Sequence, residues 1–92
     1  MKHVLLYEST EDTPTRAPLH FAAHRSWYEG FHANGTLLMI GVFTDAQDGA
    51  PAAMGIFTTR EAAEAFVAGD PFVTHGLVRQ WQIRPWNEVL AG

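Results

Sequence analysis

Cysteine is missing from this chain of 92 residues. Its absence excludes a disulfide framework, a thiolate metal site and a cysteine nucleophile together. The sequence also has neither a glycine-rich loop of the kind that cradles phosphate nor a serine in a strained strand-to-helix turn. Candidate chemistry therefore has to come from its five His residues and its carboxylates.

Basic side chains are few. Six Lys and Arg stand against ten Asp and Glu, which gives a formal net charge of −4. A wide basic surface for nucleic acid is therefore not expected. No apolar run approaches the roughly 20 residues of a membrane span. The apolar run at the N-terminus is too short for a secretory signal and is soon followed by a charged residue. We expect a soluble, cytoplasmic protein that binds neither nucleic acid nor membrane.

Apolar residues, in contrast, are plentiful. They make up 47% of the chain, and aromatic residues make up 12%, so a packed core is expected. The length suits one compact domain and is too short for two. Residues 1–92 are therefore predicted to form a single domain.

The pattern of apolar residues predicts four strands. Two short apolar runs, one nearly continuous apolar run and one alternating run each suit a strand better than a helix. The expected strands are His3–Tyr7, Thr36–Phe43, Ala53–Thr58 and Leu77–Trp86. Residues 8–15 have the composition of a polar loop, and the turn-forming residues in 44–51 predict a hairpin between the second and third strands.

Helical spacing predicts two helices between these strands. The first covers about Ala17–Ala33, and its apolar stripe consists of Leu19, Ala23, Trp27 and Phe31. The second begins at a capping box, with Thr58 as the N-cap and Glu61 three residues later, and it ends at Gly69. Residues 70–76 then form a short turn.

The resulting order is β-α-β-β-α-β, which predicts a ferredoxin-like α+β fold. In this plan a four-stranded antiparallel sheet carries two helices on one face. The strand over 36–43 nevertheless has apolar residues on both faces, with Leu37, Met39 and Phe43 on one and Leu38, Ile40 and Val42 on the other. Burying each Leu or Ile is worth roughly 1.5–3 kcal/mol. We therefore expect a homodimer packed sheet to sheet, with a loop or C-terminal tail folded over the sheet as the alternative.

Histidines recur along the first predicted helix. His20, His24, Tyr28 and His32 are four residues apart and share a face. His20 and His24 have the spacing of a two-histidine metal site, but the acidic residue of the zinc-protease pattern is missing between them. We expect neither a metal nor another cofactor, and His20 or His32 is interpreted as a solvated or hydrogen-bonded helix residue. His75 lies in the short turn.

Asp70 directly precedes Pro71. Asp is a preferred N-cap and Pro is preferred just after a cap, so this pair alone favours a structural role. A carboxylate beside an imidazole can also fix the tautomer of the ring and produce a base that works near neutrality. Whether Asp70 meets a histidine depends on the fold.

The sequence resembles the YciI-like (YCII-related) domain family over nearly its whole length. The resemblance rests on His24, eleven residues before Gly35, and on three segments: Leu37–Gly41, Gly69–Phe72 and Ile83–Trp86. It implies a ferredoxin-like dimer related to the dimeric α+β barrels.

By resemblance, the family's His and Asp active-site pair falls on His24 and Asp70. Most members have no assigned reaction, and the few that have one are similar to dehydrochlorinases or isomerases of small ring compounds. Two positions depart from the family pattern. Phe21 stands where many members carry Arg, and Gly41-Val42 stands where many carry Gly-Pro.

Two classes of function fit these residues. The first is a small lyase or isomerase, with His24 as general base or acid, Asp70 as its orienting partner, and Tyr28, Phe72 and Trp27 around a small ring substrate. In it, Tyr28 could also donate a proton or a hydrogen bond. The second is a non-catalytic dimer that binds a small ligand or recruits another chain, favoured by Phe21 and by the capping role of Asp70.

Overall fold

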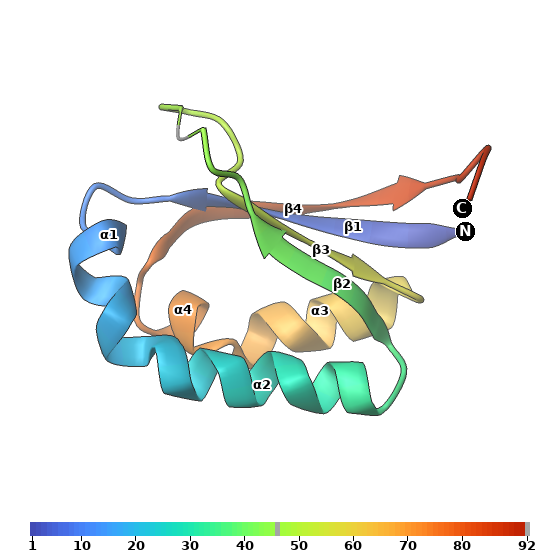
Figure 1. Cartoon of the computed structure of the whole chain (residues 1–92), viewed down its shortest axis with the longest axis horizontal. Helices are drawn as coiled ribbons and strands as arrows, with labels where there is room; N and C mark the ends of the chain where they lie inside the picture. Colours follow the sequence, from blue (N-terminus) through green and yellow to red (C-terminus); the bar gives the residue numbers. More distant parts are fainter. Residues whose placement is uncertain (46, 92) are drawn as a thin grey trace.

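A computed structural model describes residues 1–45 and 47–91. Its elements follow in the order β1 (Lys2–Ser9), α1 (Thr13–Arg16), the 3-10 helix η1 (Ala17–His20), α2 (Phe21–Ala33), β2 (Leu37–Val42), β3 (Ala53–Phe57), α3 (Arg60–Gly69), α4 (Pro71–Thr74) and β4 (Val78–Trp86). The strands form a 4-stranded sheet in the order β2-β3-β1-β4 (Figure 1). All three pairings are antiparallel. The predicted ferredoxin-like α+β fold is confirmed.

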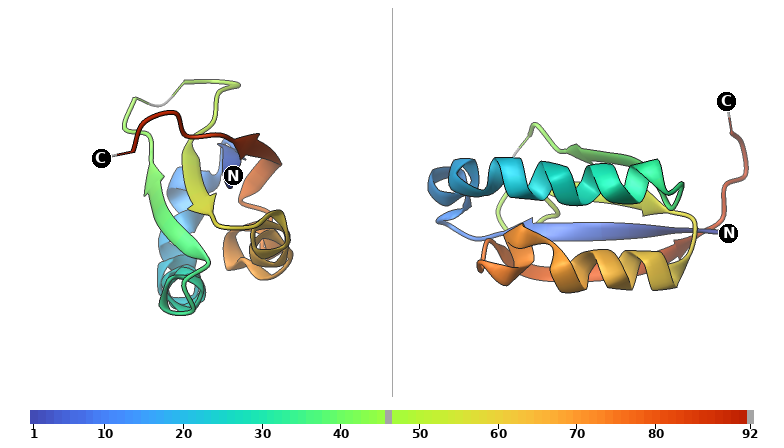
Figure 2. Two further views of the ribbon diagram at one scale, coloured as in Figure 1. Left: turned by 90° about the vertical axis from the view of Figure 1, so that its right-hand side faces the viewer. Right: turned by 90° about the horizontal axis from the view of Figure 1, so that it is seen from below.

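The helices α2 and α3 lie side by side on one face of the sheet, as the end-on view shows (Figure 2). Strand alternation sends Leu5 and Tyr7 of β1 to that face, where both are buried. Phe57 and Phe66 meet them in the core from β3 and α3. None of the helices in the described ranges is long and apolar enough to cross a membrane.

The first predicted helix starts earlier than expected and is interrupted. Residues 13–16 are helical rather than a loop, and α2 begins only at Phe21. Pro14 and Pro18 each occupy the first turn of a short helical segment. Because Pro18 has no N–H to donate, a continuous α-helix cannot run through it, and the chain passes through a 3-10 turn instead.

Only two of the four residues in the predicted apolar stripe of this helix pack against the core. Leu19 and Ala23 are exposed, whereas Trp27 and Phe31 pack against the core. An α-helix has 3.6 residues per turn, so a stripe spaced every four residues drifts around the axis. Over these residues the drift is large enough to turn the stripe away from the sheet.

The N-cap of α3 is Thr59, one residue later than predicted. Its hydroxyl accepts a hydrogen bond from the Ala62 N–H at 3.1 Å. The Thr58 N–H instead donates to the Thr36 carbonyl at 2.9 Å, which prolongs the pairing of β2 and β3. Thr58 is therefore held by the sheet and cannot begin the helix, so the Thr58–Glu61 capping box does not form.

A β-bulge in β2 changes the predicted faces of this strand. Leu37 lies opposite Phe57, whereas Met39 lies opposite the neighbouring Ile56. The register shift removes simple alternation, so Leu37 shares the helix-covered face with Ile40 and Val42, and Met39 points to the other face. The predicted grouping of Leu37 with Met39 is therefore wrong, whereas Ile40 and Val42 share a face as predicted.

Trp27 packs tightly against Gly69 where α2 and α3 meet. A Cβ atom added at Gly69 would lie 2.5 Å from the indole ring of Trp27, whereas one added at Gly30 would meet nothing within 4 Å. We expect Gly69→Ala to lower the free energy of unfolding by about 1–3 kcal/mol. Gly30→Ala, the matched control inside α2, should raise it by about 1 kcal/mol. Urea denaturation of both variants measures the difference, and equal effects would contradict the close contact.

Candidate active site

Asp70 joins α3 to α4 and is completely buried. As the residue before Pro71 it is disfavoured in helical geometry, and it adopts an extended conformation with φ −63° and ψ 122°. Its Oδ1 accepts a hydrogen bond from the Phe72 N–H at 3.1 Å. The predicted N-cap is therefore present, and this local hydrogen bond orients the carboxylate.

Two further side chains bind the same carboxylate. His24 Nδ1 of α2 lies 2.7 Å from Asp70 Oδ1, and the Tyr7 hydroxyl of β1 donates to Oδ2 at 2.7 Å. Both carboxylate oxygens thus act as acceptors, so Nδ1 of His24 carries the hydrogen. The remaining ring nitrogen, Nε2, is left for a proton or a ligand.

Aromatic neighbours hold the imidazole of His24 in place. The ring of Phe72 stacks on it, with centroids 3.8 Å apart and an angle of 7° between the planes. Tyr28 meets its edge at a centroid distance of 5.3 Å. Packing and the bond to Asp70 together fix the orientation of the ring.

Tyr7 was missed by the sequence analysis. Burial, followed by the charge of Asp70 and the hydrogen bond to it, raises the pKa of Tyr7 far above its usual range. The phenol therefore stays protonated and donates to Asp70 at any pH near neutrality. A signal was available in the sequence: alternation places Tyr7 on the core face with Leu5, and a buried phenol needs a hydrogen-bond partner.

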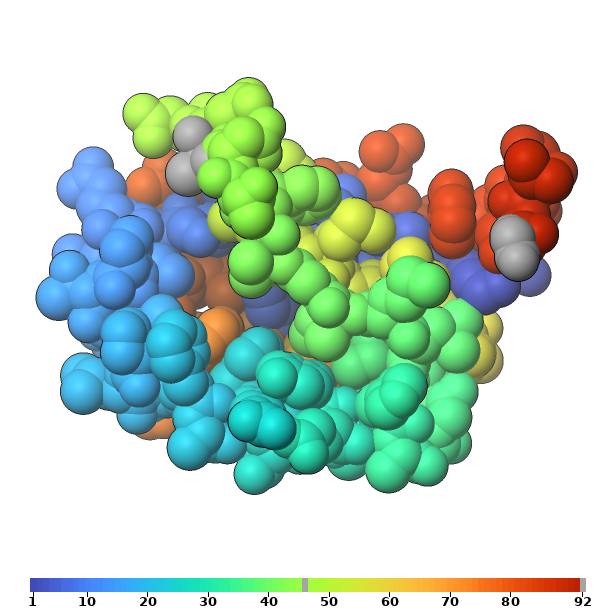
Figure 3. Space-filling model, in the orientation of Figure 1, coloured from blue at the N-terminus to red at the C-terminus, as the bar shows by residue number. Residues whose placement is uncertain are grey.

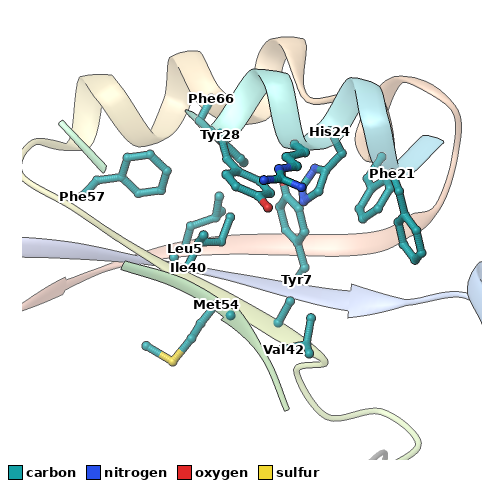
Figure 4. A pocket seen from close by; sticks show the side chains of 15 residues that line it. Leu5, Tyr7, Phe21, His24, Tyr28, Ile40, Val42, Met54, Phe57 and Phe66 are labelled. Atoms are coloured by element: carbon teal, nitrogen blue, oxygen red, sulfur yellow. The ribbon is translucent and has the colours of Figure 1, made fainter. Parts of the chain in front are cut away.

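A cavity of about 350 Å³ lies between α2 and the sheet. Its α2 side consists of Phe21, His24, Arg25 and Tyr28, which recur at the i, i+3, i+4, i+7 spacing of one helix face. Ile40 and Val42 of β2 lie opposite them, placed there by the bulge (Figure 4). The surface is hollowed between the start of α2 and β2 (Figure 3). The cavity is therefore open to a small molecule.

Two of the three residues predicted around a ring substrate, Tyr28 and Phe72, line this cavity, but Trp27 does not. Its Nε1–H donates to the Phe66 carbonyl at 2.9 Å, and its indole packs against Phe31 and Phe66. One position before Tyr28 on the helix, it faces α3 rather than the cavity. The structure therefore does not bring Trp27 together with Tyr28 and Phe72 around the cavity.

Arg25 is a cavity residue that the sequence analysis did not single out. Its Nε donates to Glu29 Oε1 at 2.6 Å. That hydrogen bond, with the charge of Glu29, raises the pKa of Arg25. Arg25 therefore brings a permanent positive charge to the mouth of the cavity.

The other histidines lie apart from His24. The ring of His20 stacks on His75 at a centroid distance of 4.1 Å, and partial desolvation with the charges of His75 and Arg16 lowers the pKa of His20. His32 bonds through Nδ1 to the Leu37 carbonyl at 2.9 Å. In residues 1–45 and 47–91 no three His, Asp or Glu side chains are grouped so that they could hold a metal ion.

Comparison with known proteins gives a family match and fold relatives. A family model described as "YCII-related domain" matches residues 1–87. No curated protein matches the sequence. The structure is similar to that of 5-chloro-2-hydroxyhydroquinone dehydrochlorinase (TftG) from Burkholderia phenoliruptrix in complex with 2,5-dihydroxybenzoquinone, with TM-score 0.73, 20% identity and coverage of 95% of this chain and 94% of the other.

A second solved structure, At3g17210 from Arabidopsis thaliana, has TM-score 0.53 and 14% identity, with 99% of this chain and 97% of the other covered. At these identities the two likenesses show a shared fold.

Proposed function

The chain belongs to the YCII-related domain family, and from that premise and the geometry of the cavity we propose that it is an enzyme of lyase or isomerase type that transfers a proton on a small ring substrate without a cofactor. The observation that carries the proposal is the buried His24–Asp70 pair. Its 2.7 Å bond uses Nδ1 of His24, which lines the cavity, and within residues 1–45 and 47–91 no hydrogen bond engages Nε2. An imidazole held in this way is suited to act as a general base or acid near neutral pH.

In the proposed reaction His24 Nε2 removes a proton from the substrate. Asp70 keeps the ring in the Nδ1–H tautomer and stabilises the imidazolium that forms. In an elimination, a leaving group departs from the ring as the proton is taken; in an isomerisation, His24 returns the proton to another atom. A positioned base of this kind contributes typically about 10²–10⁴-fold to the rate.

The size of the cavity and the fold relative support a ring substrate. A volume of about 350 Å³ falls within the range of roughly 300–1,000 Å³ found for small-molecule sites. The dehydrochlorinase of the same fold holds 2,5-dihydroxybenzoquinone, a small oxygenated ring. A compound of this size would fill the space between α2 and β2.

The proposal is tested with 5-chloro-2-hydroxyhydroquinone and a panel of halogenated and unhalogenated hydroquinones. We expect saturable turnover, followed by absorbance and by chloride release, and competitive inhibition by 2,5-dihydroxybenzoquinone. Chloride release no faster than in buffer, with no change in any unhalogenated member of the panel, would reject the proposed reaction class.

A non-catalytic ligand-binding or accessory dimer is the second candidate. It is favoured by the capping bond from the Phe72 N–H to Asp70 and by the bond from Tyr7, because these give the carboxylate a structural purpose of its own. Tight binding of 2,5-dihydroxybenzoquinone without turnover of any panel member would support this candidate over the enzyme.

We further propose that the chain forms a homodimer through the sheet face opposite α2 and α3. Leu6 of β1 and Met54 of β3 lie opposite each other on that face, next to Met39, which is 68% exposed. Covering these side chains with a second copy would remove a large apolar area from water.

Leu6→Lys tests the dimer. A lysine in the middle of the sheet face would be desolvated without a partner, at a cost of several kcal/mol, so the dissociation constant should rise about 100-fold or more. Leu19→Lys, at an exposed position away from this face (79% exposed), is the matched control and should leave it unchanged. Sedimentation equilibrium measures both, and a wild type that is monomeric at high concentration would contradict the dimer.

A further inference from the structure

The polar side chains of the cavity are concentrated on its α2 side. His24 and Tyr28 project from this helix towards Ile40 and Val42 of the strand opposite (Figure 4). Arg25 of the same helix also lines the cavity. The strands contribute one polar side chain to the lining, Tyr7, and its hydroxyl is bonded to Asp70. A ring bound here would rest on an apolar surface and direct its polar substituents towards α2. The chemistry of those substituents is then set by three side chains of one helix.

The α2 side of the cavity carries positive charge. Arg25 is permanently charged, and among the described residues that line the cavity none is Asp or Glu. Asp70 lies behind His24, fully buried, with its oxygens occupied by three donors. A ligand therefore meets positive charge and no opposing carboxylate in the lining.

The guanidinium of Arg25 has more N–H donors than its bond to Glu29 uses. Glu29, which is not among the cavity residues, accepts from Nε. Within the part of the chain that the structure describes, no hydrogen bond engages the two terminal nitrogens, so they can donate to a ligand oxygen. The ion pair is exposed, with side-chain exposures of 72% and 56%, and such a pair is worth little in water. An anion in the cavity can therefore share or replace Glu29 at small cost.

Tyr28 adds a second donor beside this charge. Its hydroxyl points into the cavity (Figure 4), and the Tyr28 ring contacts His24 at a centroid distance of 5.3 Å. Because Arg25 and Tyr28 are three residues apart on one helix face, both can reach the same oxygen of a ring held next to His24.

We propose that the ligand of this cavity is a small ring that carries an anionic oxygen (a carboxylate, phenolate or enolate), which pairs with Arg25. The inference rests on the proposed function and narrows its substrate class. When His24 Nε2 takes a proton from a ring hydroxyl, the O–H bond breaks, the electron pair stays on oxygen, and Arg25 stabilises the resulting negative charge. The step needs no oxidant or reductant.

The test compares benzoate with benzamide, which have the same shape and differ in charge. Wild-type protein should bind benzoate about tenfold more tightly than benzamide, measured by calorimetry and by amide chemical shifts of α2. Arg25→Gln should abolish this preference, and Glu29→Gln should strengthen it by removing the negative charge that competes with the ligand for Arg25.

Arg60→Gln is the matched control, because Arg60 forms an i,i+4 ion pair with Glu64 on α3 and lies outside the cavity. It removes the same charge and should leave the preference unchanged. Equal affinities in the wild type, a preference that survives Arg25→Gln, or no benzoate binding up to millimolar concentration would each overturn the inference.

Because the readout is binding, this test is separable from that of the enzyme proposal. An Arg25-dependent preference in a protein that turns over no ring compound would keep the anionic ligand and reject the enzyme. Turnover that depends on His24, in a protein that binds benzoate and benzamide equally well, would support the enzyme and reject the anionic ligand.

Discussion

Replacing His24 with glutamine is expected to reduce turnover of a ring substrate by about 10²–10⁴-fold with the fold intact. Glutamine can still donate a hydrogen bond to Asp70 Oδ1, which His24 contacts at 2.7 Å, and it fills a similar volume against Phe72. It has no group that accepts and releases a proton near neutral pH. The change therefore removes proton transfer and keeps most of the packing.

The measurement is the rate constant kcat for whichever panel compound the wild type converts, together with thermal unfolding followed by circular dichroism. His32→Gln is the matched control, because His32 also lies on α2 and bonds through Nδ1 to the Leu37 carbonyl without lining the cavity. Added imidazole should partly restore turnover in His24→Ala, whose cavity can admit the free base. A kcat of His24→Gln within a few-fold of wild type would exclude His24 as the base.

Asp70→Ala is expected to lower the free energy of unfolding by about 3–5 kcal/mol. The change removes the N-cap of α4 and leaves the buried Tyr7 hydroxyl and His24 Nδ1 without an acceptor. Since small domains are stable by roughly 5–15 kcal/mol, this loss would unfold a large fraction of the protein on warming. Urea denaturation at 25 °C measures it.

Two milder variants separate the structural and the chemical parts of this network. Tyr7→Phe removes a single donor and should lower stability by about 1–2 kcal/mol. Asp70→Asn keeps the cap and most of the volume when its amide oxygen takes the place of Oδ1, which serves both the Phe72 N–H and His24. Its NH2 group then faces Tyr7, and the negative charge that stabilises the imidazolium of His24 is lost. We expect turnover of Asp70→Asn to fall much more than its stability.

The proposed network predicts that these changes are coupled. In a double-mutant cycle, the free-energy changes of Tyr7→Phe and Asp70→Asn should not add, because both variants disturb the same hydrogen bond at 2.7 Å. Additive effects, or an Asp70→Ala variant within 1 kcal/mol of wild type, would show that the carboxylate does not hold β1, α2 and α4 together.

Local residue preferences predicted some features of the site and missed others. The cap at Asp70 was predictable because Asp-Pro acts on the next few residues only, and the lining role of Tyr28 and Phe72 was expected as well. Trp27 does not join Tyr28 in the cavity lining, because neighbouring residues on a helix are turned by about 100° from each other and the indole of Trp27 faces α3. Tyr7 was overlooked although its strand position marked it as buried.

The sequence by itself determined the order of the four strands and of the two main helices, and the capped turn at Asp70-Pro71. Each of these depends on residues close together in the chain, where apolar periodicity and turn chemistry act directly. The tertiary structure alone decided that Tyr7 and His24, 63 and 46 positions from Asp70, meet on one carboxylate. It also decided, through the bulge in β2, that Ile40 and Val42 face His24 and Arg25 across the cavity. Such contacts follow from the strand register and the packing of α2 on the sheet, which are set by interactions of the whole core and by no single segment.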